Sequence, residues 1–348
     1  MLDFDLFNPA EMTGYVRELA FAEYELVNWL PVVERQDVDY AFSVADKRRE
    51  EMAPYRGFDV PAPIGDRPGV SRVTGAIPPL SKKLMLTEWE RLNLQRSQGN
   101  STAAMMIQDL AYDDAALLTE SLQARLEYAR GTVLQTGTVT FVTDTGFTGV
   151  VIDYNINGTA VTAVTAGTLW SDYTNADPVA NLRTWTQAYI IRNKGRRPGV
   201  FLTSDLVIND MISCQKLRAY TGVGATIPSI LTLEQANQVF IAHGCPPVRA
   251  YNAQVNVPGS GDTPVLANNK GLLMPAGADT VRFGETTMGV TAEALELVGK
   301  GFLTLPTAPG FVGVGMTEFD PVTKWTKVAG LGVPVLKDPN LITIATVR

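Results

Sequence analysis

The sequence contains very few of the side chains on which metal binding, covalent cross-linking and acid–base catalysis depend. Only two cysteines and one histidine occur among 348 residues. Cys214 and Cys245 cannot form a disulfide framework, and neither lies in the paired Cys-x-x-Cys spacing of a structural zinc site. His243 has no further Cys or His that would complete a ligand set, so we interpret it as a structural residue near a helix end. The cysteine usage favours a reducing compartment.

Charged side chains are also scarce, at 19% of the residues, and 36 acidic against 29 basic residues give a net charge of -7. Sequence-specific DNA binding is built largely from Lys and Arg that neutralise phosphates, so an acidic chain without long basic runs is a poor candidate for it. Residues 1–5 lack the positive region and apolar run of a secretory signal. An uncharged stretch at 154–171 is rich in Asn, Thr and Gly, which is typical of strands and turns. We therefore expect no contact with a membrane.

Catalytic motifs are incomplete. Asp144-Thr145-Gly146 matches the short motif of pepsin-like proteases, in which two aspartates share a proton and activate a water. The motif occurs once, and the same three residues are typical of a hairpin turn. Glycine pairs elsewhere lack the third glycine of a nucleotide-binding loop. We therefore expect no catalytic residue, metal or cofactor, and we keep a hydrolase that uses Asp144 as an alternative.

Glycine and proline, by contrast, are abundant, with 30 and 21 copies. Residues 53–79 alone contain six prolines and four glycines, which excludes a helix and leaves too few large apolar side chains for a core. Extended residues alternate around Val70, Arg72 and Thr74, and a strand-like segment follows at 80–87. The pattern favours a long projecting β-hairpin, and a flexible linker is the alternative.

Two segments have helical periodicity. Leu19, Leu26 and Leu30 share one face of a helix that we predict over 10–30, with Pro31 as its stop. The second and stronger signal covers 102–134, where apolar residues recur every three or four positions at Ile107, Ala111, Ala115, Leu118, Leu122, Leu126, Ala129 and Val133. We expect the polar residues Asp109, Asp113, Glu120, Gln123, Glu127 and Arg130 on its opposite face.

The second helix bears on the shape of the molecule. The apolar pattern repeats every 11 residues, which keeps the stripe almost straight along the helix. Asn100 or Ser101 can cap its start, and Gly131 and Gly137 mark its end. It would be roughly 50 Å long, about the diameter of a compact globule of this chain length. We therefore predict a flat or elongated subunit; a coiled-coil dimer is the alternative, although the stripe is short and rich in Ala.

The rest of the chain alternates strands and helices. Segments 138–142 and 149–154 read as strands around a turn at 143–147, and 159–165 reads as a third strand. Asp177 caps a helix with Pro178 at its first position, a buried strand follows at 200–203, and Thr232 with Gln235 forms a capping box. This alternation between 177 and 250 indicates a mixed α/β domain. A turn at 318–321 and a closing strand at 341–347 complete the pattern.

The order of these parts resembles the major capsid proteins of tailed phages, in particular the lambda-like capsid E family with the HK97-like fold. The likeness extends over nearly the whole chain, and four local strings carry it: Leu6-Phe7-Asn8-Pro9, residues 124–137, residues 197–203 and residues 333–340. It implies an α+β fold with an N-terminal arm at 1–40, an extended β-hairpin loop (E-loop) region at 41–95, a peripheral domain with a spine helix and β-sheet at 96–176, an axial α/β domain at 177–315 and return strands to the peripheral domain at 316–348.

The resemblance also implies a function. It indicates a structural major capsid protein, not an enzyme, that self-assembles as hexamers and pentamers into an icosahedral shell around the double-stranded DNA genome of a tailed phage. The protein would be made in the host cytoplasm and reside in the virion capsid. An encapsulin-like cellular compartment with the same fold is the alternative.

The partners implied by the resemblance are chiefly other copies of the chain. No cleavable extension precedes the arm, so we expect a separate scaffolding protein, together with a portal and, where the shell carries one, a decoration protein. Packaged DNA would be touched only by non-specific contact. Arg67, Arg72, Lys82 and Lys83 are candidate inter-subunit contacts of the extended loop, and ordinary solvated charge is the alternative interpretation of these four residues.

Overall fold

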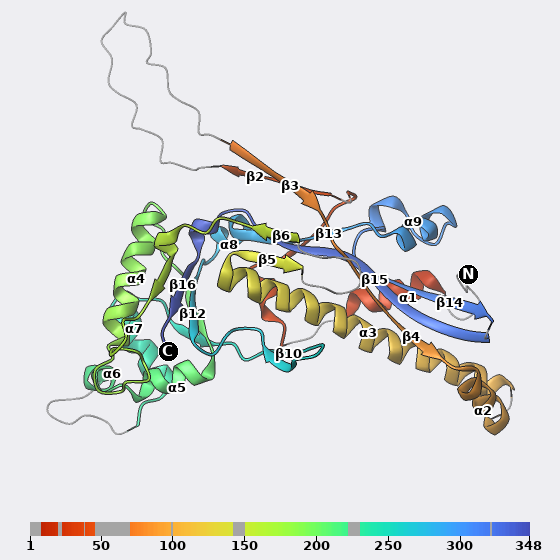
Figure 1. Ribbon diagram of the computed structural model, residues 1–348, viewed down its shortest axis with the longest axis horizontal. Helices are drawn as coiled ribbons and strands as arrows, with labels where there is room; N and C mark the ends of the chain where they lie inside the picture. Colours follow the sequence, from red (N-terminus) through yellow and green to blue (C-terminus); the bar gives the residue numbers. More distant parts are fainter. Residues whose placement is uncertain are drawn as a thin grey trace, which may run out of the picture.

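The computed structural model describes residues 8–19, 23–37, 39–45, 70–98, 100–141, 150–221, 230–320 and 322–348. The molecule is elongated, as predicted (Figure 1). Helix α2 (Glu88–Gln98) lies at one end and helix α4 (Pro178–Arg192) at the other, and the long helix α3 (Asn100–Thr136) runs between them.

Helix α3 confirms the strongest periodic signal of the sequence. Its 37 residues correspond to about 55 Å of helix, and the predicted stripe is buried at Ala111, Ala115, Leu118, Leu122, Leu126 and Val133. This stripe packs on a sheet of the same chain, so the coiled-coil alternative is wrong. Gly137, with φ +73°, follows the last helical residue as expected, but Gly131 lies inside the helix. A Cβ at Gly131 would lie 2.6 Å from the backbone oxygen of Val265, so this glycine permits a close contact instead of ending the helix.

The sheet under α3 is built around the long strand β15 (Val322–Leu336). Its antiparallel neighbours are β14 (Val312–Phe319), β13 (Gly284–Gly289) and β4 (Pro79–Leu86), and β1 (Val32–Glu34) runs parallel to β13. Helix α1 (Pro9–Glu18) adds Met12 and Val16 to the apolar cluster between α3 and β15. The predicted turn is confirmed, because β14 ends at Phe319 and β15 begins at Val322. Helix α9 (Ala292–Gly299) and the 3-10 turn η3 (Leu305–Thr307) connect β13 to β14.

A second sheet forms the core of the other end of the molecule. Its strand order is β7 (Val161–Ala163), β16 (Thr343–Thr346), β12 (Lys270–Met274), β8 (Val200–Thr203) and β9 (Val248–Ala250). Helices α4, α5 (Asp205–Ser213), α6 (Gln215–Thr221) and α7 (Leu233–Ala242) lie at this end (Figure 1). The predicted caps are confirmed: the Asp177 side chain accepts from Ala180 N, and Thr232 and Gln235 form a capping box. Trp170, Trp185 and Phe201 pack their rings together in this core.

The sequence did not indicate the partners of two strands. Strands β5 (Thr138–Phe141) and β6 (Val150–Asp153) form the expected hairpin, but β7 does not extend it and instead pairs parallel to β16. The closing strand β16 belongs to the second sheet, where it pairs with β12. The resemblance placed this strand among the return strands to the peripheral domain. The Arg192 side chain donates to the carbonyls of Thr159, Asn340 and Ile342 and so holds both segments against α4. The turn η2 (Gly158–Ala160) precedes β7, and η4 (Pro339–Leu341) precedes β16.

The N-terminal helix is shorter than predicted. Helix α1 ends at Glu18, Leu19 is extended, and only the turn η1 (Glu25–Asn28) follows within the predicted range. The Gln123 side chain of α3 donates to the Leu19 carbonyl, and Glu127 accepts from Leu26 N. Contacts with α3 thus replace the hydrogen bonds that a continuous helix would have made. The leucine periodicity marked the buried face of this arm correctly but not its conformation.

The projecting hairpin is present at its base. Strands β2 (Asp39–Ala45) and β3 (Val70–Ala76) pair antiparallel and stand away from the body of the molecule (Figure 1). Most of the proline-rich segment lies outside the described residues. Strand β4, which follows, belongs to the body and not to the hairpin. Helix α2 was not predicted at all.

Three small elements complete the fold. Strands β10 (Gln254–Val257) and β11 (Gly261–Pro264) form a hairpin beside α3, and helix α8 (Ala278–Phe283) leads into β13. Within the ranges that the structure describes, no helix has the length and apolar character needed to cross a membrane.

Candidate functional site

A buried ionic cluster joins α3 to three other parts of the chain. Glu127 and Arg130, which we predicted on the polar face of the helix, are 0% and 5% exposed. One carboxylate oxygen of Glu127 accepts from Leu26 N at 2.8 Å and from the Tyr251 hydroxyl at 2.6 Å. Its other oxygen accepts from Arg130 Nη1 at 2.9 Å, and Arg130 Nε donates to Thr286 Oγ1 at 2.8 Å. We call Glu127, Arg130, Tyr251 and Thr286 the α3 hub.

The buried charges of the α3 hub compensate each other. Burial lowers the pKa of Arg130, and the neighbouring Glu127 carboxylate opposes that shift by stabilising the charged guanidinium. Burial together with the same carboxylate raises the pKa of Tyr251, so its hydroxyl keeps the proton that it donates. Every charge is matched inside the chain, which is typical of a structural cluster rather than a catalytic one. The sequence contains no signal for this cluster, because its partners lie far away along the chain, at Leu26, Tyr251 and Thr286.

Two arginines anchor segments by binding backbone carbonyls. Arg17 of α1 donates to the carbonyls of Thr307, Pro309 and Phe311 at 2.7 to 2.9 Å, so the arm is tied to the segment that leads into β14. Arg192 does the same for η4, at the carbonyl of Asn340, and for Ile342, which follows η4. These contacts hold the ends of the chain against the body without any bound ligand.

The four predicted contact residues lie at different places. Arg67 is outside the described residues. Arg72 lies in β3, in register with Ser43 of β2. Lys82 and Lys83 are exposed neighbours in β4, where successive side chains point to opposite faces of the sheet. Of the three that lie in described elements, Arg72 is in the hairpin, and Lys82 and Lys83 are on opposite faces of β4.

Lys83 is engaged within its own chain. It lies directly opposite Lys327 in the β4–β15 register, an unfavourable pairing of like charges. Two contacts relieve it: the Lys83 Nζ lies 3.9 Å from the centre of the Trp325 ring, and Lys327 forms an ion pair with Glu293 of α9. Both lysines are thus held by side chains of the same subunit.

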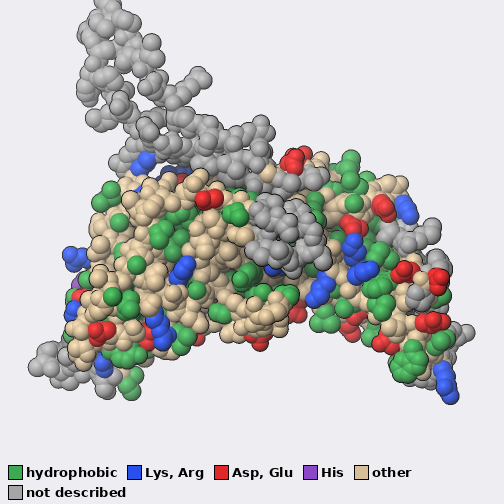
Figure 2. Space-filling view, in the orientation of Figure 1, with side chains coloured by type: hydrophobic (Ala, Val, Ile, Leu, Met, Phe, Trp, Pro, Cys, Tyr) green, Lys and Arg blue, Asp and Glu red, His purple; other side chains and the backbone are tan. Residues whose placement is uncertain are grey.

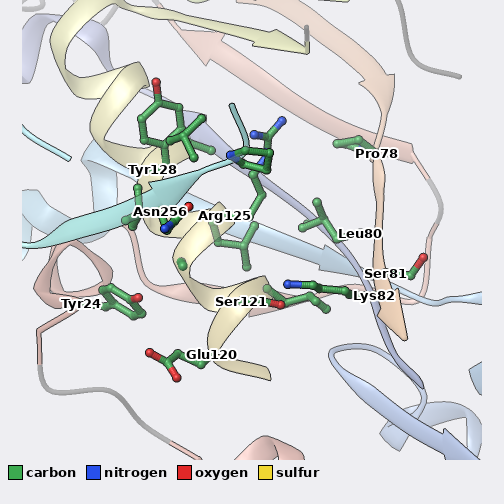
Figure 3. A pocket seen from close by; sticks show the side chains of 18 of the residues that line it. Tyr24, Pro78, Leu80, Ser81, Lys82, Glu120, Ser121, Arg125, Tyr128 and Asn256 are labelled. Carbon is green, nitrogen blue, oxygen red and sulfur yellow. The ribbon is translucent and has the colours of Figure 1, made fainter. Parts of the chain in front are cut away.

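Lys82 points to the other face and lines a groove of about 800 Å³ along α3. Strand β4 forms one wall of the groove, β10 forms the other, and α3 forms the floor (Figure 3). Figure 3 shows Lys82 directed toward Ser121, with Tyr24 and Glu120 near one end and Tyr128 near the other. Both signs of charge line the groove, and it lacks a cluster of acid–base or nucleophilic groups.

The two cysteines and the histidine that the sequence analysis considered lie in surroundings typical of structural residues. Burial raises the pKa of Cys214 to about 12 and also raises that of Cys245, so neither thiol is poised as a nucleophile. His243 is the C-cap of α7, as expected, and its ring lies 5.0 Å from that of Tyr220. Asp144 lies outside the described residues. Across the described ranges, no group of three His, Cys, Asp or Glu side chains could hold a metal ion.

Comparison with solved structures shows the fold. A prophage protein of Escherichia coli CFT073 described as a capsid protein matches with a TM-score of 0.66 at 16% identity, over 98% of this chain and 99% of that one. A phage-related protein of Bordetella bronchiseptica RB50 gives 0.61 at 10% identity, over 99% and 96%. The capsid of cyanophage A-1(L) gives 0.51 at 13% identity, over 94% of both chains. The chain therefore has the HK97-like fold, as predicted.

Comparison of sequences shows the family. No curated protein matches the sequence. The family model described as phage major capsid protein E, however, matches residues 10–347, nearly the whole chain. This match supports neither the hydrolase nor the encapsulin-like alternative. The chain belongs to the phage major capsid protein E family, and it is a structural subunit of an icosahedral virion capsid and not an enzyme.

Proposed function

We propose that the hairpin of β2 and β3 links neighbouring subunits of the capsid by lying across the next copy. The single observation that supports this most directly is its isolation: among the described strands, β2 and β3 pair only with each other and stand off the body (Figure 1). An isolated two-stranded hairpin is at best marginally stable in water, so it needs a second surface to pack on. Capsid proteins self-assemble, and the copy beside it supplies that surface.

We further propose that the regions of the chain have the roles that the family resemblance implies. Residues 1–40 are the arm, 41–95 the extended-loop region, 96–176 the peripheral domain, 177–315 the axial domain at the centre of hexamers and pentamers, and 316–348 the return strands. The α3 hub supports rigid, preformed subunits, because Thr286 of β13 and Tyr251, which follows β9, connect both sheets to α3. Strand β16 is the exception within the last segment, since it completes the second sheet.

The finer partners are also proposals. We propose that the shell encloses the double-stranded DNA genome of a tailed phage, that a separate scaffolding protein and a portal take part in assembly, and that a decoration protein is an optional addition. A net charge of -7 suits a container that touches DNA only non-specifically. Arg67, Arg72, Lys82 and Lys83 remain proposed contacts. Lys82 is the favoured one of the β4 pair, because Lys83 is held over Trp325.

A shortened hairpin tests this proposal. Ala45 and Val70 are paired residues at the described end of the hairpin, so a two-residue Asn-Gly turn can join them in place of residues 46–69. We expect a folded subunit that no longer forms shells, because the part that reaches the next copy is gone. The readout is negative-stain microscopy and analytical ultracentrifugation, with the full-length chain assembled in parallel.

The control is the fold of the shortened subunit. Its far-ultraviolet circular dichroism and thermal unfolding should match those of the full-length subunit, since the deletion begins beyond the paired strands. Shells of normal size and yield from the shortened chain would contradict the proposed role of the hairpin.

A further inference from the structure

An exposed apolar surface lies at the α2 end of the molecule. Trp89 is 72% exposed and Leu92 58% exposed on α2, and Met85 of β4 and Leu110 of α3 add 45% and 40% exposed side chains. Met85, Trp89 and Leu110 line one shallow hollow together with Arg96 and Asp114. We call these six residues the α2 patch. Figure 2 shows hydrophobic side chains gathered at this end of the molecule, with acidic and basic side chains around them.

The α2 patch has the composition of a protein contact. Isolated exposed apolar residues are ordinary, but contiguous ones rimmed by polar groups mark interaction surfaces. Tryptophan and arginine are the residue types that most often dominate the energy of an interface. Burying an exposed Trp removes a large apolar area from water, and no element of the described chain covers this one. The inner side of α2 already packs on α3, so the exposed side is the one that remains for a partner.

Charges in the α2 patch indicate which partner fits. Among the described residues, Arg96 forms no ion pair, and no cation lies within 4.0 Å of the Asp114 carboxylate. Burial, Asp113 and Glu90 raise the pKa of Asp114, so this carboxylate lacks a compensating charge. Glu90 is different, because its carboxylate is occupied by the backbone and hydroxyl of Thr87. One surface therefore carries an unmatched cation and an unmatched anion.

We propose that the α2 patch is a contact between two copies of this chain, related by a two-fold axis, with Trp89 at its centre and Arg96 of each copy facing Asp114 of the other. A two-fold contact uses the same surface on both subunits, so it requires a surface that is complementary to itself. Opposite unmatched charges beside an exposed tryptophan meet that requirement. The inference rests on the proposed function, the hairpin link between neighbouring copies, because one small contact becomes effective when each subunit makes several others.

Charge reversal tests the pairing between copies. Arg96→Asp leaves two acidic groups in the α2 patch, and Asp114→Arg leaves two basic ones, so each variant repels its own copies. We expect each variant alone to lower shell yield by roughly tenfold or more. Mixing the two unassembled variants should restore the yield, because each two-fold contact between unlike copies then holds two opposite-charge pairs. An effect within one subunit would not be repaired by mixing.

The apolar part of the contact has a matched control. Trp89→Ser should reduce shell yield, whereas Ile191→Ser, at an isolated side chain that is 79% exposed on α4, should not. Circular dichroism and thermal unfolding of the unassembled subunits establish whether each variant folds. If a reversal variant fails to fold, cross-linking keeps the inference testable. Asn93→Cys lies in the same hollow, and a short bismaleimide should join it to its counterpart as a dimer in assembled shells.

The outcomes separate the two proposals. Normal shells from the chain with the shortened hairpin would refute the proposed function and leave the α2 contact standing. Normal shells from the unchanged chain and from both reversal variants would overturn the α2 contact alone. Monomers only after cross-linking of Asn93→Cys shells would overturn it as well.

Discussion

Glu127 joins α3 to two distant segments of the chain. Its carboxylate accepts from the arm at Leu26, from Tyr251 and from Arg130 of its own helix. Removing it would leave the Arg130 guanidinium, 5% exposed, without a counter-charge. A buried ion pair adds little net stability over an apolar pair, but half of such a pair is strongly destabilising. The α3 hub therefore predicts that a variant lacking one member of the ion pair loses more stability than a variant lacking both.

We predict that Glu127→Leu lowers the free energy of unfolding by about 3 to 5 kcal/mol, because a buried charge loses its partner. The double variant Glu127→Leu with Arg130→Met should recover a large part of this loss, since no unpaired charge remains. Urea unfolding of the unassembled subunit measures both. Glu120→Leu, at a half-buried position earlier on α3, is the control and should change stability little. Equal losses in the single and double variants would show that the ion pair does not govern stability here.

Gly131 supplies a second prediction, in which packing opposes helix propensity. Alanine in a helix interior is favoured over glycine by about 1 kcal/mol. At Gly131, however, the added Cβ would lie 2.5 Å from Val265 Cγ1 and 2.6 Å from the Val265 carbonyl oxygen. Overpacking of this kind costs about 1 to 3 kcal/mol, so Gly131→Ala should lower the thermal unfolding midpoint of the subunit.

Gly14 of α1 is the matched control for this effect. A Cβ there would meet nothing within 4 Å, so Gly14→Ala should raise the unfolding midpoint slightly. If both alanine variants were equally stabilised, the close approach of α3 to Val265 would not affect the stability of the subunit.

At the scale of elements, the sequence predicted what local chemistry determines. Asp177 and Thr232 were recognised as caps because a short side chain followed by a helical pattern satisfies free backbone amides nearby. The stripe of α3 was recognised because burial on one face requires its period. Local chemistry does not determine the choice of distant partners. Nothing near 161–163 in the sequence indicates that β7 pairs with β16, or that Arg192 will hold both in place.

The candidate site was less predictable than the fold, for the same reason. Lys82 and Lys83 are adjacent in sequence, yet one lines the α3 groove and the other lies over Trp325. Their difference arises from strand alternation and from the side chains of β15. The α2 patch escaped notice because Met85, Trp89 and Leu110 come from three different elements. A helix with an exposed tryptophan is meaningful only once the structure shows that nothing in the described chain covers it.

At the scale of the whole molecule, two sheets are held to one long helix by buried charge as well as by apolar packing. Glu285 of β13 is bound by Arg35, which follows β1, and by Lys337, which follows β15. Burial by itself would raise the pKa of Glu285. Hydrogen bonds and charge from Lys337 and Arg35 outweigh burial and hold the pKa of Glu285 below its ordinary value. Glu293 is similar: Lys327 overcomes the effect of burial and lowers its pKa. Both carboxylates therefore couple the stability of the fold to pH.

The sign of this coupling gives the last prediction. A carboxylate whose folded pKa lies below its unfolded value stabilises the fold above the unfolded pKa and loses this contribution as pH falls through the folded pKa. At pH 7, Glu285→Gln should cost about 2 kcal/mol, because charge-assisted hydrogen bonds to two cations are weakened. That difference from the unchanged subunit should shrink as pH falls from the ordinary carboxyl range through the lowered pKa of Glu285, where the folded protein takes up the proton as well. Urea unfolding between pH 7 and pH 3 measures it, with Glu296→Gln on the exposed face of α9 as the control. A difference that stays constant over this range would mean that the ion pairs of Glu285 do not contribute to acid sensitivity.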